Sequence, residues 1–435
     1  MAKLDLPAQS PSWGTAARAD AEGMRRTRGL GLGAAVRRYN DLAVPGIGGL
    51  WFAKPLVWSM IGLTLGGKGA TRAEVANAVE VVAMLHALLT NRGGRNPRIN
   101  GSAKLGRQGN SFPPFAVARQ RRFYVTVPLR QGMIQPLREL GLAQSYIQRF
   151  NSFEPSEVGK DFLSAALEPF RPHRQEVQKV VKRWIDGEAG LMHTAEVRDA
   201  LTPLTGLPKP AAELLREQLF GGAQARPRRR VRDWLRAVKA SGEVVSWSSP
   251  PEGFDAEHWN DLRDGARFFL VRDRALDVLD AIEAQLRSSG STEIRLDAAV
   301  KAAASALEQL RRTSKEFLSG NPVERADALN FAVATSQADD ARVLTFLAER
   351  DGRGVRATPN GVATGSAFDP HGPLSQAPVD EGTVRLSEDD DAPAPEAKGL
   401  QLPPGASGRL RALVSLDQDI EDACGTVGTN RGVLS

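Results

Sequence analysis

The sequence predicts a mainly α-helical protein built from many helices, with one or two short β-hairpins and two flexible segments. Apolar residues recur at helical spacing over most of the chain, and many of these runs begin at a capping residue or Pro and end at Gly. An apolar content of 41% with 25% charged residues is typical of a globular protein with a real core. A length of 435 residues predicts two or three domains.

The single cysteine and the composition of the N-terminal residues indicate the compartment in which the protein works. Cys424 is the only cysteine, which excludes a disulfide framework and any zinc site built on several thiolates. A nearly cysteine-free chain also fits a reducing compartment. Residues 1–28 have no apolar stretch of the kind that a secretory signal needs. We therefore expect a cytoplasmic protein.

Composition predicts two flexible segments and a final helix. Residues 1–28 lack hydrophobic periodicity and are expected to form a disordered arm. Residues 366–407 are rich in Pro, Gly and acidic residues and are expected to be a disordered linker. Residues 408–435 then hold a C-terminal helix, which we expect to be tethered to the body and available to a protein partner.

Residues 29–170 are predicted to form a basic helical domain. Ile47 to Leu65 is nearly apolar enough to span a bilayer, but Lys54 and Pro55 interrupt it. We therefore favour a buried helix starting at Pro55 over a membrane segment. The next helix, over residues 71–89, opens with the capping-box residues Thr71 and Glu74.

The stretch from Arg121 to Phe153 is the centre of that domain. Residues 124–127 are β-branched or aromatic and predict a strand, and residues 129–140 have helical apolar spacing. An extended segment to Phe153 and a helix start after Pro155 follow. This order resembles the back half of a winged helix, and the alternative is an ordinary helix-plus-hairpin packing unit.

Residues 171–365 are predicted to form a second helical domain that ends in a β-hairpin. A succession of helical patterns ends near residue 350, and Asn360-Gly361 then lies between two short extended runs. Asn-Gly in that context is a strong hairpin signal. The order resembles the recognition helix and wing of winged-helix proteins, and the alternative is a hairpin that only caps the helices.

The charge distribution points to an anionic partner. Residues 1–150 carry a net charge of +14 and the remainder −8, and residues 91–150 hold eleven basic residues against Glu139 alone. Either a polyanion or an acidic protein surface must balance such an excess. The candidate nucleic-acid-binding residues are Arg92, Arg95, Arg98, Lys104, Arg107, Arg119, Arg121, Arg122, Arg130, Gln131, Gln135, Arg138 and Arg149.

The sequence offers no convincing catalytic, metal or cofactor motif, so we predict none of the three. Gly62 to Gly69 nearly matches a phosphate loop but has Gly69 where the motif needs a hydroxyl. Residues 255–261 contain metal-ligand types, but a capped helix start explains them better. His86 falls late in the helix over residues 71–89 and is expected to be partly buried.

These observations together favour a non-catalytic, nucleic-acid-associated protein of a bacterial-type cytosol that binds DNA through its basic N-terminal half. Phosphate contacts would supply the affinity, and base reading would fall to Arg130, Gln131, Gln135 and Arg138. The alternative is a scaffold or adaptor subunit of a bacterial multi-protein system, of the defence or mobile-element kind. A metal- or nucleotide-dependent enzyme comes third, and no membrane association is expected.

Overall fold

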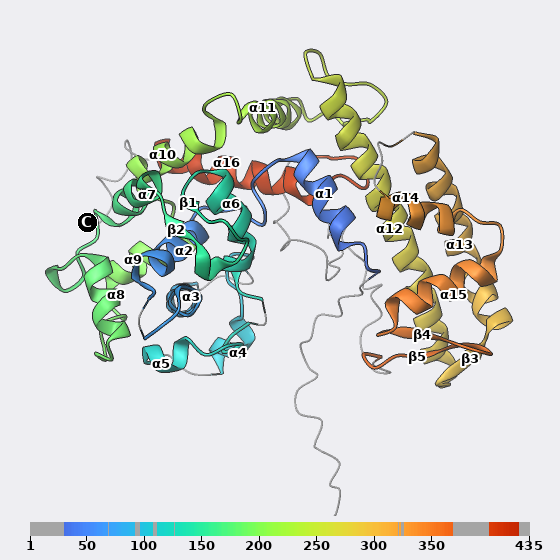
Figure 1. Ribbon diagram of the computed structural model, residues 1–435, viewed down its shortest axis with the longest axis horizontal. Helices are drawn as coiled ribbons and strands as arrows, with labels where there is room; N and C mark the ends of the chain where they lie inside the picture. Colours follow the sequence, from blue (N-terminus) through green and yellow to red (C-terminus); the bar gives the residue numbers. More distant parts are fainter. Residues whose placement is uncertain are drawn as a thin grey trace, which may run out of the picture.

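The structure confirms the mainly α-helical fold class. The computed structural model describes residues 30–67, 69–91, 96–107, 111–125, 127–320, 322, 326–368 and 400–425. Within these residues it contains sixteen α-helices and two small antiparallel sheets (Figure 1). The predicted arm (residues 1–28) lies outside the described residues, as does most of the predicted linker.

Two hydrophobic cores divide the molecule into two lobes. The first core draws its residues from 43–262 and 400–423, and the second from 30–39 and 268–362. The division therefore falls within α12 (Ala256–Ser289), and the boundary that we placed at residue 170 lies inside the first core. Figure 1 shows the two lobes side by side, with the N-terminal half of α12 between them.

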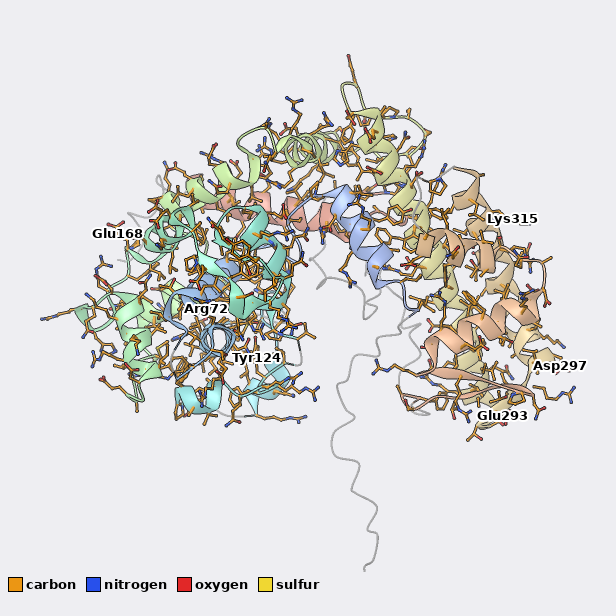
Figure 2. All side chains as sticks on the ribbon, in the orientation of Figure 1. Arg72, Tyr124, Glu168, Glu293, Asp297 and Lys315 are labelled. Carbon is orange, nitrogen blue, oxygen red and sulfur yellow. The ribbon has the colours of Figure 1, made fainter. Side chains whose placement is uncertain are left out.

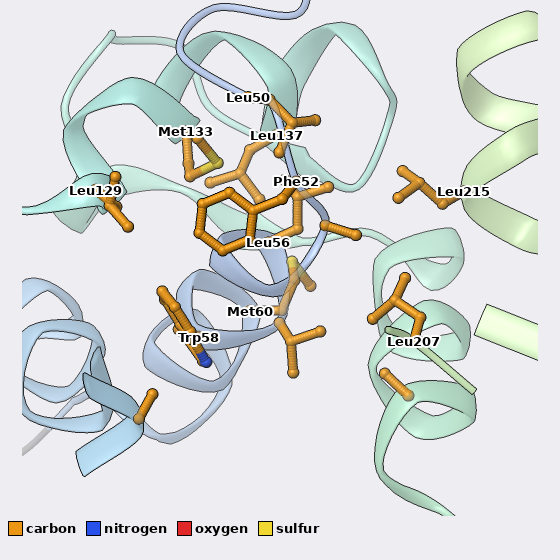
Figure 3. Close-up of a cluster of buried hydrophobic side chains, with 14 of the residues drawn as sticks. Leu50, Phe52, Leu56, Trp58, Met60, Leu129, Met133, Leu137, Leu207 and Leu215 are labelled. Atoms are coloured by element: carbon orange, nitrogen blue, oxygen red, sulfur yellow. The ribbon is translucent and has the colours of Figure 1, made fainter. Parts of the chain in front are cut away.

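The first lobe is built around α2 (Lys54–Leu65) and α3 (Arg72–Thr90). Gly62 lets the two helices approach closely, because a Cβ there would lie 2.6 Å from the Cβ of Ala76. Almost all of α2 is buried and Pro55 lies in its first turn, as predicted. Figure 3 shows side chains of this region against Met133 and Leu137.

By length and apolar composition, α3 is the one helix in the described part of the chain that could cross a membrane, and 67% of its apolar window is buried in the protein.

Shorter helices and turns cover this central pair. They enclose a two-stranded sheet in which Ala143 pairs with Pro155 and Gln144 with Glu154. The covering elements are α4 (Ser102–Gly106), α5 (Phe115–Ala118), α6 (Ile134–Glu139), α7 (Glu157–Leu167), α8 (Val177–Ile185), α9 (Ala195–Leu201), α10 (Lys209–Phe220), α11 (Arg226–Ser241), the 3₁₀ helices η1 (Leu129–Met133), η2 (Phe150–Ser152) and η3 (Pro172–Arg174), and the strands β1 (Ala143–Gln144) and β2 (Glu154–Pro155).

The C-terminal helix α16 (Gly408–Gly425) is part of the first core, so the expectation of a tethered helix was wrong. Its leucines are buried between α10 and α11 and the rest of the lobe. Asp419 explains much of this integration: its carboxylate accepts a hydrogen bond from the backbone N–H of Ala53 (2.9 Å), at the start of α2, and pairs with Arg98 (2.9 Å). The apolar face of α16 and this buried acid fix the helix in place.

The second lobe consists of long helices and a three-stranded sheet. Strand β5 (Gly361–Thr364) is central, with β3 (Glu293–Arg295) and β4 (Val355–Thr358) on either side. The predicted hairpin is confirmed, although its two-residue turn is Pro359-Asn360 because Gly361 already pairs with Thr358. The remaining helices are α13 (Leu296–Ser319), α14 (Ala326–Thr335) and α15 (Asp340–Asp351).

Helix α1 (Gly33–Ala43) connects the two lobes alongside α12. Its Tyr39 packs on Phe268 with 5.1 Å between ring centroids, and Gly265 of α12 faces the Tyr39 ring without a side chain of its own. Two residues further along α1, the carboxylate of Asp41 binds Arg409 of α16. The two lobes thus share a two-helix junction.

Candidate nucleic-acid interface

The stretch over residues 121–153 folds differently from its predicted strand, helix and hairpin. Its described residues between 124 and 127 form no strand, and the Tyr124 ring is buried instead. The predicted helix is η1 followed by α6, and Pro136 lies in the first turn of α6, where its missing N–H is not needed. The predicted wing is reduced to the two pairs of β1 and β2.

This stretch surrounds the N-terminal end of α3, and together they form one surface. We call it the α3 surface and define it as residues 72–77, 116–122, 130 and 145–151. The helix start is capped as predicted: the Thr71 hydroxyl accepts from Glu74 N–H, and the Glu74 carboxylate accepts from Thr71 N–H (2.7 Å). The side-chain carbonyl of Asn151 accepts from Ala73 N–H at 2.8 Å. The backbone donors of Ala73 and Glu74 are therefore used inside the protein, so an anion here has to be held mainly by side chains.

Three arginines line a pocket of about 470 Å³ on this surface. Arg119 directly follows α5, Arg121 lies in the next turn and Arg130 lies in η1. Helix α3 forms the opposite wall, with Glu74 as its one acidic group. Arg119 donates to the carbonyl of Gly69 (3.2 Å) and lies 3.7 Å from the Glu74 carboxylate. With three guanidinium groups against one carboxylate, the pocket carries net positive charge. Its lining residues are Ala73, Glu74, Asn77, Ala116, Arg119, Gln120, Arg121 and Arg130.

Arg130 connects the pocket to the buried core of the lobe. Its Nε donates to Oδ1 of Asn77 (2.6 Å), and its guanidinium lies over the Phe150 ring, 5.4 Å from the centroid. Beneath it Glu80 is buried, with a carboxylate oxygen that accepts from Leu129 N–H (2.9 Å). Burial raises the pKa of Glu80 to about 7, and burial also lowers the pKa of Arg130. Arg130 thus forms a wall of the pocket, and its side chain is already fixed by Asn77 and Phe150.

Beside the pocket lies a rim of exposed basic side chains. Lys104 and Arg107 lie on and just after α4, and Arg121 and Arg122 lie in the turn after α5. The Lys104 ammonium is 3.5 Å from the carbonyl oxygen of Arg122, which brings the two segments together. Within the part of the chain that the structure describes, no acidic side chain lies within 4 Å of Arg107, Arg121 or Arg122. These charges face solvent. Figure 2 labels Arg72 and Tyr124, which mark this part of the first lobe.

Several of the predicted contact residues are engaged inside the protein instead. Arg98 pairs with Asp419, donates to the carbonyl of Pro203 (3.1 Å) and stacks on Phe52. The Gln135 side chain donates to Asp41 and accepts from Arg409. We therefore leave Arg98 and Gln135 out of the interface, and with them the base-reading role that we predicted for Gln135.

The remaining candidates divide into three groups. Arg138 is exposed and pairs with the neighbouring Glu139 at 2.6 Å, so its charge is locally balanced. Gln131 and Arg149 are exposed, and Arg149 belongs to the loop of the α3 surface. Arg92 and Arg95 lie outside the described residues.

The chain matches no protein-family model, and the searches of curated proteins and of solved structures find no match either. The two resemblances to winged-helix proteins therefore stay predictions.

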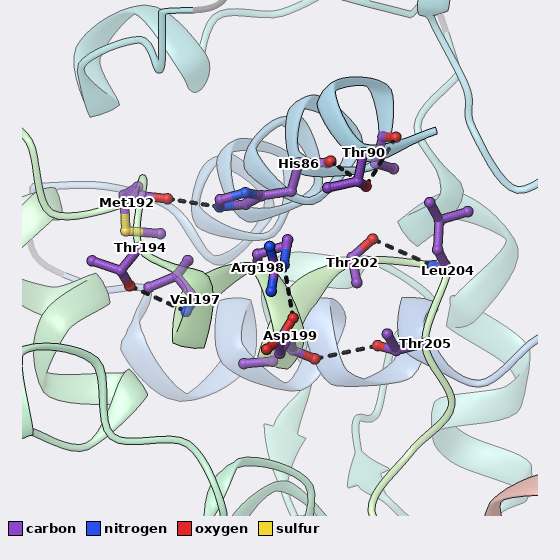
Figure 4. A network of polar contacts seen from close by, with 12 residues as sticks. His86, Thr90, Met192, Thr194, Val197, Arg198, Asp199, Thr202, Leu204 and Thr205 are labelled. Carbon is purple, nitrogen blue, oxygen red and sulfur yellow. Dashed lines mark hydrogen bonds and ion pairs between the residues drawn. The ribbon is translucent and has the colours of Figure 1, made fainter. Parts of the chain in front are cut away.

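His86 is held inside the first lobe. It is buried in α3, and its Nε2 donates to the carbonyl of Met192 at 2.8 Å, as Figure 4 shows. Burial lowers the pKa of His86 to about 4, so the ring is neutral at physiological pH. The ion pair in the same view joins Arg198 to Asp199, the next residue of α9. Among the described residues, no group of three or more His, Cys, Asp or Glu could hold a metal ion.

A second pocket, of about 430 Å³, lies between α11 and α16. Both acidic side chains of its lining bind one arginine: the Arg236 guanidinium donates to Asp417 (2.6 and 2.8 Å) and to Glu421 (2.9 Å). These bonds raise the pKa of Arg236. Helix α11 also carries a second basic run, residues 226–239, in which Arg228 and Arg229 donate to backbone carbonyls and Arg232 pairs with Asp233. Much of this run is therefore engaged within the first lobe.

Proposed function

We propose that this protein binds nucleic acid through phosphate contacts made by the α3 surface and the basic rim beside it. One observation carries the proposal: the exposed cations Lys104, Arg107 and Arg122 lie beside a pocket whose walls carry one carboxylate and three arginines, Arg119, Arg121 and Arg130. Arginine suits this role because its planar group donates two parallel hydrogen bonds to phosphate oxygens. A local excess of positive charge also attracts a polyanion over distances beyond contact.

The charge of the second lobe supports placing the interface on the first. Residues 268–362 hold 13 basic and 14 acidic side chains, so this lobe has almost no net charge to offer phosphate. The hairpin after α15, which resembles a wing, belongs to this neutral lobe. Phosphate binding by the second lobe would have to rely on individual side chains, without help from a surrounding field.

The proposal is tested by titrating a fluorescent 20-base-pair duplex of random sequence with the full chain at several salt concentrations. Each phosphate contact contributes about −0.9 to the slope of log K against log [salt]. Replacing Arg107, Arg121 and Arg122 together by Gln is expected to make the slope shallower by up to about 2.7, which is three contacts. Circular dichroism checks that the variant is folded.

The matched control removes three positive charges from the second lobe, with Arg295, Lys301 and Arg356 replaced by Gln. These side chains are exposed, so the net charge changes equally while the proposed interface is untouched. The control is expected to keep the wild-type slope. A shallow slope for the wild-type chain with both this duplex and a single strand of the same sequence, or an equal loss in both variants, overturns the proposal.

A scaffold or adaptor is the second candidate. The pocket between α11 and α16 favours it, because Leu235, Leu413 and Val414 line that pocket together with charged side chains, a mixture suited to a peptide. The titration separates the two candidates. A scaffold gives weak duplex binding with a shallow slope that the triple substitution leaves unchanged.

A further inference from the structure

The loop between β1 and β2 presents an aromatic side chain to solvent at the edge of the basic surface. Tyr146 has the full exposure of an extended chain (108%), and its neighbour Ile147 is 55% exposed. The next two residues, Gln148 and Arg149, are also exposed. Large side chains exposed singly are common on proteins, but here a ring, a second apolar side chain and a cation follow one another in four residues.

The loop that presents Tyr146 is held by its own hydrogen bonds. The Ser145 hydroxyl donates to the carbonyl of Ile147 (2.7 Å), and the Ser152 hydroxyl donates to the carbonyl of Arg149 (2.6 Å). At its far end the buried rings of Phe150 and Phe153 anchor the loop in the first core. The ring of Tyr146 therefore projects from a supported backbone, which lowers the ordering cost of any contact that it makes.

Contacts at the end of the loop join it to the arginine pocket. Phe150 lies under the guanidinium of Arg130, and Asn151 receives hydrogen bonds from Ala73 N–H and from Arg72 Nη1 (3.0 Å). Tyr146 precedes Phe150 by four residues, which span at most ~14 Å of chain. A few nucleotides can therefore reach from the Tyr146 ring to the pocket.

We propose that the α3 surface selects single-stranded nucleic acid, with an unstacked base on the Tyr146 ring and the backbone phosphates on Arg149 and the arginine pocket. This inference rests on the proposed phosphate binding and names the ligand class. Bases in a duplex are stacked on each other and hide their faces, whereas a single strand can place a base against a protein ring. Proteins that bind single strands combine exposed aromatic rings with phosphate-binding cationic side chains.

The test compares a labelled 20-nucleotide single strand with the duplex of the same sequence, by fluorescence anisotropy with the full chain in 0.1 M salt. Base–aromatic stacking contributes ~1–3 kcal/mol, so we expect Tyr146→Ala to weaken single-strand binding about 5- to 150-fold. Duplex binding is expected to change less than about twofold, because a duplex uses the phosphate contacts alone. Tyr146→Trp and Tyr146→Phe keep a ring and are expected to retain single-strand affinity.

Tyr146→Leu is the matched control, because it keeps an apolar side chain of similar reach without a π face. Its single-strand affinity is expected to fall with that of Tyr146→Ala. Equal affinity of wild type and Tyr146→Ala for the single strand, or an equal loss for strand and duplex, overturns the single-strand inference while leaving phosphate binding intact. Failure of both nucleic acids to show steep salt dependence overturns both proposals.

Discussion

The two lobes cover their cores with helices in different ways. The second lobe uses a 34-residue and a 24-residue helix with a three-stranded sheet, whereas in the first lobe most of the elements that cover α2 and α3 are short helices and turns. Their charges differ too: residues 91–150 of the first lobe carry an excess of ten positive charges, and residues 268–362 carry almost none. In the irregular segments of the first lobe, side chains such as Arg121 and Tyr146 lie on exposed turns. A regular packed helix would instead bury the side chains on one of its faces. The candidate site lies on the irregular lobe for this reason.

Tryptophan provides a way to examine each lobe separately. Trp51, Trp58, Trp184, Trp234 and Trp259 belong to the first core, and Trp247 packs against it. The second core contains no tryptophan among its described residues. Fluorescence from these six tryptophans therefore follows the first lobe, and the seventh, Trp13, lies outside the described residues. Far-ultraviolet circular dichroism follows the helices of both lobes.

The largest effect is expected from Asp419→Ala, which tests whether the first lobe depends on its distant C-terminal helix. The substitution leaves Arg98 and the N–H of Ala53 without their partner. We expect the free energy of unfolding of the first lobe to fall by about 3–5 kcal/mol, measured by urea with tryptophan fluorescence. Asp422→Ala, at an exposed position of the same helix, is the control and should change it by under about 0.5 kcal/mol. Equal effects of the two would contradict the role of Asp419.

A pH-dependent effect is expected at Glu80, beneath the arginine pocket. Burial raises its pKa from 4.5 to about 7, so between these values the unfolded chain has lost a proton that the folded chain keeps. Stability from this site therefore falls as the pH rises through that window, by about 3 kcal/mol in all. Glu80→Gln keeps an acceptor for Leu129 N–H and cannot ionise, so its advantage should grow from near zero at pH 4.5 to about 3 kcal/mol at pH 8.

Urea unfolding at pH 4.5, 6 and 8 measures the Glu80 effect. Glu168→Gln, at an exposed position of the same lobe, is the control and is expected to follow the wild-type pH dependence. A constant difference between Glu80→Gln and wild type at all three pH values would show that Glu80 does not keep its proton on folding.

Gly361→Ala tests whether the second lobe can be destabilised alone. A Cβ at this position of β5 would lie 2.0 Å from the carbonyl oxygen of Ile294 in β3, so the strands must move apart. We expect a loss of about 1–3 kcal/mol in the second lobe, detected by circular dichroism and amide hydrogen exchange. Asn360→Ala, in the exposed turn next to it, is the control. If the tryptophan transition shifts equally, the two lobes unfold as one unit.

The smallest effects are expected from one helix cap in each lobe. Thr71 caps α3 and Asp339 caps α15, each by accepting a backbone N–H three residues on. Thr71→Ala and Asp339→Ala should each remove about 1 kcal/mol. Only Thr71→Ala should shift the tryptophan transition. A shift of that transition by Asp339→Ala would show that the stability of the first lobe depends on the second.

The sequence predicted the elements whose signal is local. Spacing and turn chemistry predicted the capping box of Thr71 and Glu74, the buried helix that starts at Pro55, and the hairpin around Asn360-Gly361. The structure contains each of them. The strand predicted for residues 124–127 failed, because Tyr124 is buried in the core rather than paired in a sheet. Strand β3 was not predicted, since three residues carry too little periodicity.

Contacts between distant residues could not be predicted from the chain. Charge counting found the basic region, but it could not show that Arg98 is held by Asp419, more than 300 residues away. It also missed Tyr146, because a single aromatic residue in a loop has no pattern around it. A useful signal was present nonetheless: Tyr146 and Ile147 lie in the extended segment predicted after the helix over residues 129–140, and Arg149 follows them.

Helix α12 runs without interruption from the first core into the second, and its 34 residues correspond to about 51 Å. The helix therefore sets the orientation of the second lobe relative to the first. Inserting one residue between Leu262 and Phe268 would shift the second lobe by about 1.5 Å along the helix axis and rotate it by about 100°. Because α1 crosses the same segment at Gly265, that rotation would have to break the Tyr39 contact. The number of residues in α12 therefore determines the rotation of one lobe relative to the other. We expect insertions at this point to be far less tolerated than insertions in the exposed turns of either lobe.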